Sequence, residues 1–96
     1  MLLNGIINIS ANDLPCFASL VQTPFIAIKP ADIAAESIEK YERLMKILTD
    51  SGFPVPNRLR ISDDMLIIAY RGGKPMQYIM DSLTTAGITF LDYTKK

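Results

Sequence analysis

The chain of 96 residues contains no histidine and no tryptophan, and its single cysteine is Cys16. Histidine is the commonest general acid or base in enzymes and the commonest metal ligand, so its absence removes the usual starting point for both kinds of site. A lone cysteine forms no intramolecular disulfide, and without histidine it lacks its usual activating base. We therefore expect no enzyme, no catalytic residue, no metal site and no cofactor, and we expect Cys16 to be a buried, inert thiol.

The chain also has no net charge, because it contains ten basic and ten acidic residues. A neutral chain has no overall field to steer it onto nucleic acid or an anionic membrane. The sequence has no run approaching the ~20 apolar residues that span a bilayer, and its first residues lack the pattern of a signal peptide. These absences predict a cytoplasmic protein with no membrane partner.

Apolar residues, in contrast, are plentiful, at 49% of the chain, while charged residues make up 21%. Soluble domains carry about 25% charged residues, and a chain of this length makes a single domain. A small domain with few charges leaves apolar surface uncovered, which favours self-association or a dedicated partner.

Two helices are indicated by apolar residues spaced three and four apart. The first is expected over residues 32–51, because Asp32 is a good N-cap and Gly52 a good stop. The second is expected to begin at Pro75, a residue that suits the first helical position, and to end at Gly87.

Four strands are predicted around these helices, over residues 24–29, 58–62, 65–70 and 88–93. Asp63 and Asp64 separate the middle two, which indicates a β-hairpin. The order strand, helix, strand, strand, helix, strand resembles the ferredoxin-like βαββαβ sandwich. We therefore predict an α+β fold of this kind over residues 24–95.

Residues 1–23 are extra to that pattern and are predicted to form a β-rich N-terminal extension of a core over residues 24–96. Residues 2–9 are rich in isoleucine, and Asp13 is a candidate cap for a short helix after them. The segment either adds an edge strand to the sheet or pairs with a second copy of the protein.

The best candidate for a ligand site is the loop Arg71, Gly72, Gly73 and Lys74. Glycines let backbone N–H groups approach a ligand, and a helix N-terminus favours an anion. Arg71 can bind a carboxylate or phosphate with two hydrogen bonds. The alternative interpretation is a strand-to-helix turn with solvated charges.

A second candidate is the pair Arg58 and Arg60, which alternate with apolar residues and so should project from one face of a strand. Such a stripe suits single-stranded nucleic acid, but the glycine and aromatic signature of an RNA-recognition motif is missing. It equally suits an edge strand that avoids pairing.

These observations favour a small, non-catalytic regulatory protein that binds another protein and forms a homodimer. The first alternative is a domain that senses a small anion or a nucleotide through Arg71–Lys74, which a thermal shift with the anion would reveal. The second alternative is single-stranded nucleic-acid binding through Arg58 and Arg60, which would weaken steeply with salt.

Overall fold

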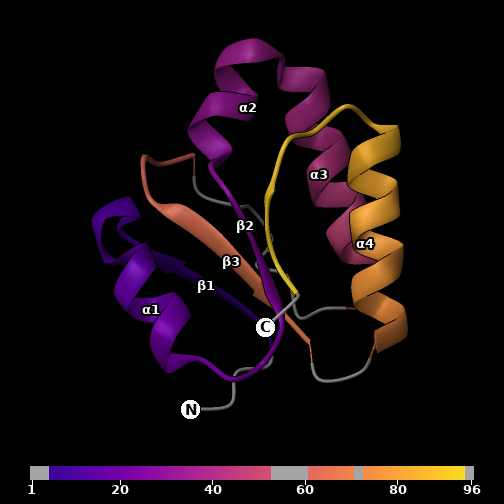
Figure 1. The fold of residues 1–96 in the computed structure, drawn as a ribbon. Helices are drawn as coiled ribbons and strands as arrows, with labels where there is room; N and C mark the ends of the chain where they lie inside the picture. Colours follow the sequence, from indigo (N-terminus) through magenta and orange to yellow (C-terminus); the bar gives the residue numbers. More distant parts are fainter. Residues whose placement is uncertain (1–4, 53–60, 71–72, 95–96) are drawn as a thin grey trace.

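Apolar runs of the chain form the strands of one antiparallel sheet (Figure 1). The structure is a computed structural model that describes residues 5–52, 61–70 and 73–94. Within these residues the sheet has the strands β1 (Gly5–Ile9), β2 (Phe25–Ile28), β3 (Met65–Ala69) and β4 (Leu91–Tyr93), in the order β1–β3–β2–β4. The central strands β2 and β3 are buried at every position, which explains why both are apolar without interruption.

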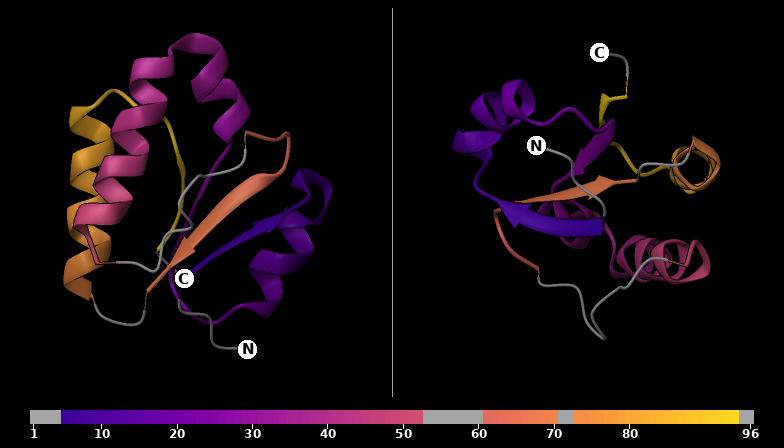
Figure 2. Two further views of the ribbon diagram at one scale, coloured as in Figure 1. Left: turned by 180° about the vertical axis from the view of Figure 1, so that it is seen from behind. Right: turned by 90° about the horizontal axis from the view of Figure 1, so that it is seen from below.

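Helices lie on both sides of this sheet. In the described part of the chain they are the 3₁₀ turn η1 (Ala11–Asp13) and the α-helices α1 (Leu14–Leu20), α2 (Pro30–Glu36), α3 (Ile38–Asp50) and α4 (Gly73–Thr85). Figure 2 shows α1 on one side of the sheet and α3 and α4 on the other. The protein is thus a small α+β domain with a four-stranded antiparallel sheet.

The two faces of the sheet bury two separate cores, because successive residues of a strand point to opposite faces. The face toward α3 and α4 buries Ile26, Ile28, Leu44, Leu48, Leu66, Ile68, Ile79 and Leu83, among others. The face toward α1 buries Leu14, Val21, Phe25, Ala27, Met65, Ile67 and Ala69. Each fully buried aliphatic side chain contributes about 1.5–3 kcal/mol to burial free energy, so both cores hold the sheet in place.

The predicted hairpin of residues 58–62 with 65–70 is wrong. β3 pairs with β1 along one side, from Gly5 opposite Ala69 to Ile9 opposite Met65, and with β2 along the other. Both edges of β3 are therefore occupied, and Ile61 carries no strand structure. The N-terminal strand takes the place expected for residues 58–62, and the ferredoxin-like order is not confirmed. An uncharged Gly-Ile-Ile-Asn-Ile segment suits this place because it presents apolar side chains to both cores.

The first predicted helix is two helices, which separate at Ser37. This residue is extended, with φ −164° and ψ 124°, and its side chain accepts a hydrogen bond from the backbone N–H of Lys40. Serine is a strong N-cap, and the acidic Glu39 in the first turn of α3 adds to the start signal. Asp13, by contrast, makes no side-chain capping bond to α1; Ser10 caps η1 instead.

The Ser37 cap leads to a stability prediction. Replacing Ser37 with alanine is expected to lower the free energy of unfolding by about 1 kcal/mol, because the N–H of Lys40 loses its acceptor. The control is Ser19→Ala in α1, where the hydroxyl donates only to the carbonyl of Cys16 at an exposed position and the change should stay within about 0.5 kcal/mol. Urea denaturation of both variants measures the difference; equal values would show that the cap is not what ends α2 and begins α3.

Candidate functional site

β1 is an edge strand of the sheet that the described residues form. β1 pairs with β3 on one side, and no strand in the described ranges pairs with its other side. Natural edge strands carry lysine, proline or a bulge that discourages pairing, but β1 has neither charge nor proline. Asn8 is exposed, whereas Ile6, Ile7 and Ile9 are half-buried. This edge is therefore ready to accept another strand.

The opposite edge of the sheet differs from it. β4 has three residues, and the exposed Asp92 lies at its centre. The carboxylate of Asp92 accepts hydrogen bonds from the backbone N–H of Thr94 at 2.8 Å and from the Thr94 hydroxyl. A short strand with a central charge is a poor template for strand addition. The two edges are thus not equivalent, and β1 is the one open to pairing.

A cavity of about 400 Å³ is lined by residues of α2 and of the segment that leads from α4 into β4. Its apolar lining comes from three strands, from α2 and from the segment between α4 and β4: Ala27, Ile33, Met65, Ile88, Phe90 and Leu91. On the α1 face of the sheet, Phe17 and Phe25 meet edge to face and Phe25 stacks on Tyr93. The cavity is lined from both cores, because Ala27 and Met65 belong to the α1 core whereas Ile33 and Ile88 belong to the α3/α4 core.

Two ion pairs are part of the cavity lining. Lys29 Nζ lies 3.8 Å from Asp32 Oδ1, and Lys40 Nζ donates a hydrogen bond to Glu36 Oε1. Lys40 also donates to the carbonyl of Gly87, 3.3 Å away, which ties α3 to the end of α4. The cavity lining thus combines apolar side chains with two lysine–carboxylate pairs, of which Lys40 is also held by a backbone carbonyl.

The sequence did not indicate the charged residues of the cavity lining as a site. The pair Glu36 and Lys40 has the spacing of a helical ion pair, which was a possible signal. However, they belong to different helices, and the contact of Lys40 with Gly87 joins residues 47 positions apart. Nothing local in the sequence indicates that contact.

Most of the predicted site residues lie outside the described residues. This holds for Arg58, Arg60, Arg71 and Gly72, while Gly73 and Lys74 form the start of α4 and their side chains are not described. α4 begins two residues before Pro75, so its N-terminus falls within the predicted loop. Anion binding by Arg71–Lys74 and nucleic-acid binding by Arg58 and Arg60 stay predictions.

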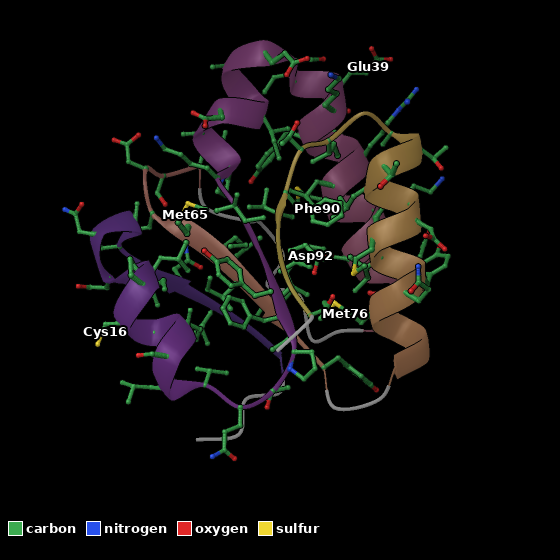
Figure 3. The ribbon with its side chains drawn as sticks, viewed as in Figure 1. Cys16, Glu39, Met65, Met76, Phe90 and Asp92 are labelled. Carbon is green, nitrogen blue, oxygen red and sulfur yellow. The ribbon has the colours of Figure 1, made fainter. Side chains whose placement is uncertain are left out.

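Cys16 does not fit its prediction, because it is exposed (Figure 3). α1 turns Leu14 and Phe17 toward the sheet, and a residue two positions after Leu14 points to the opposite side of a helix. The apolar neighbours of Cys16 in sequence were therefore misleading. In the described residues no group of three or more cysteine, aspartate or glutamate side chains is arranged to hold a metal ion.

No family model, no curated protein and no solved structure matches this chain. None of the helices in the described ranges has the length and apolarity needed to cross a bilayer.

Proposed function

We propose that the protein is a small, non-catalytic regulatory protein that binds another protein and that forms a homodimer through β1. The observation that carries this proposal is the uncharged, proline-free outer edge of β1. Adding a strand to such an edge satisfies backbone N–H and C=O groups of both partners, and side chains on the two faces then provide specificity. The proposed location is the cytoplasm, since the single cysteine requires no oxidising compartment.

A second copy fits this edge by symmetry. In a twofold dimer each β1 pairs with the β1 of its partner, and the same residues meet from both sides. Ile6 packs against the α3/α4 core, whereas Ile7 and Ile9 pack against the α1 core. Antiparallel pairing of two β1 strands would cover half-buried isoleucines on both faces and join two sheets into one. Burial of this apolar area, added to backbone hydrogen bonds, favours association.

Asn8→Lys is the variant that tests this dimer. Asn8 is exposed on β1, so a lysine there is expected to leave the fold intact while opposing strand addition. We expect light scattering after size-exclusion chromatography to give a dimer for the wild type at micromolar concentration. For the variant the dissociation constant should rise about tenfold or more, equivalent to about 1.4 kcal/mol.

The matched control is Asn12→Lys, which makes the same chemical change at an exposed position of η1, outside the strand. It should dimerise as the wild type does. A wild-type protein that is monomeric across the concentration range would refute the homodimer, and equal dissociation constants for the two variants would refute β1 as the interface.

The protein partner needs a separate experiment. Affinity capture from an extract of the native cell, with the wild type and Asn12→Lys as separate baits, should enrich the same protein over empty beads. Direct binding of that purified protein would then be measured by calorimetry. If neither bait enriches any protein, the proposal of a regulatory interaction fails even when the dimer is present.

A further inference from the structure

The cavity beside α2 is a separate feature from the β1 edge and has the properties of a small-molecule site. Its volume of about 400 Å³ lies within the range of roughly 300–1,000 Å³ that ligand pockets occupy. The half-buried Phe90 and the exposed Leu91 form its apolar floor; Ala27 and Met65 also line it but are only 1% and 7% exposed. Leu91 is 47% exposed, a high value for a leucine that lines a cavity, and an apolar ligand would cover it.

The lysine and carboxylate side chains of the two ion pairs that line the cavity differ in exposure. The lysine side chains of the two ion pairs are 38% and 29% exposed, for Lys29 and Lys40, whereas their partners Asp32 and Glu36 are 74% and 64% exposed. The lysine side chains, stems included, are therefore the less exposed members of each pair, and the carboxylates keep most of their contact with water. Exposed ion pairs of this kind contribute about 0–1 kcal/mol, so another anion can replace the carboxylates at little cost.

Lys40 is also held in position. Its Nζ donates to the carbonyl of Gly87, which itself lines the cavity wall. Gly87 has a positive φ of 75°. A Cβ built on Gly87 would lie 3.7 Å from Lys40 Nζ, so the end of the lysine side chain lies next to this turn. A lysine fixed by a backbone acceptor has lost part of its rotamer freedom before a ligand arrives, which favours binding.

We propose that this cavity binds a small amphipathic carboxylate, a molecule with one anionic head and a short apolar tail. The carboxylate is held by Lys40 and Lys29 in place of Glu36 and Asp32, and the tail lies on Phe90 and Leu91. Charge complementarity selects the anion, because Lys40 Nζ is held against the Gly87 carbonyl of the cavity wall whereas the carboxylates are the more exposed members of each pair. The apolar floor selects a tail over a purely polar ion such as phosphate.

Sodium hexanoate is the probe, with 1-hexanol, hexylammonium and norleucine as compounds that keep the six-carbon chain and change only the charge. Titration followed by ¹H–¹⁵N correlation spectra should give saturable shifts with hexanoate, with a dissociation constant in the millimolar range, at the amides of Ala27, Gly87 and Leu91. Hexanol should bind at least fivefold more weakly than hexanoate. Hexylammonium should give no saturation.

Four variants complete the test. Lys40→Met keeps the apolar stem, removes the charge and should weaken hexanoate at least fivefold, while Lys46→Met, on an exposed position of α3 outside the cavity, should change nothing. Glu36→Gln should leave affinity equal or raise it, because Lys40 is released from a competing carboxylate. The Asn8→Lys variant should bind hexanoate as the wild type does, which separates this proposal from the dimer.

The following results would overturn the proposal. Shifts that never saturate, or equal binding of hexanoate and hexylammonium, would show that no anion site exists. Tighter binding of norleucine than of hexanoate would mean that Asp32 and Glu36 hold an ammonium group and that the site takes zwitterions. Loss of binding in Glu36→Gln, or equal losses in Lys40→Met and Lys46→Met, would contradict the role given to Lys40.

Discussion

Removing residues 1–23 is expected to give a chain that does not fold at room temperature. β1 contributes five residues to the pairing with β3. Leu14 and Val21 are almost fully buried. Burying each such side chain stabilises the fold by about 1.5–3 kcal/mol. Their removal would also expose Ile67, which shares their core. The free energy of unfolding of a domain is only about 5–15 kcal/mol, so these losses are expected to remove most or all of it.

Far-UV circular dichroism and urea titration of the truncated chain measure this effect. Leu20→Ala in the full-length chain is the control, because Leu20 belongs to the same segment but is 61% exposed, and it should change stability by less than about 0.5 kcal/mol. A cooperative urea transition of the truncated chain, with a midpoint near that of the full chain, would instead support residues 24–96 as an independent core.

Phe25→Ala should have the largest effect of any single substitution considered. Phe25 is 0% exposed, meets Phe17 edge to face with ring centroids 5.4 Å apart, and stacks on Tyr93 at 4.7 Å. Truncating a buried phenylalanine costs about 3–5 kcal/mol, since the loss of apolar burial is added to the cavity left behind. At about 4–8 °C per kcal/mol for a domain of this size, the melting temperature should fall by more than about 12 °C.

Differential scanning calorimetry is the measurement for Phe25→Ala, with Phe25→Leu as the comparison that keeps most of the volume. The leucine variant should lose clearly less stability than the alanine variant, because the smaller cavity forfeits fewer contacts. Near-ultraviolet circular dichroism should report a changed environment of Tyr93 in both variants. A loss in Phe25→Ala no larger than in Leu20→Ala would show that Phe25 is not a central core residue.

The sequence predicted most secondary structure because the signals are local. Apolar runs place β2, β3 and β4 within the expected ranges, and Gly87 follows the end of α4 as expected. The break at Ser37 was missed although its cap signal was present, because the apolar stripe continues across it. An apolar stripe indicates which residues face the core, not where a helix ends. Two consecutive helices that pack on the same core therefore show one continuous stripe.

The cavity illustrates the limit of such signals. Lys29 and Ile33 of its lining are near each other in sequence, but Met65 and Leu91 come from other strands. Only the order of strands in the sheet places them together. The exposure of Cys16 has the same cause, since the rotation of α1 on the sheet depends on which of its residues find a partner there.

By itself the sequence determined most of the segments that become strands and helices, and its lack of histidine favoured binding over bond-making chemistry. Tertiary structure alone decided the neighbour of β3. Residues 5–9 occupy the edge that the hairpin of residues 58–62 was expected to fill. Segments that are distant in sequence compete to pair with the same strand. The outcome depends on the apolar area that each segment can bury on both faces of the sheet, and a local sequence pattern does not give that area.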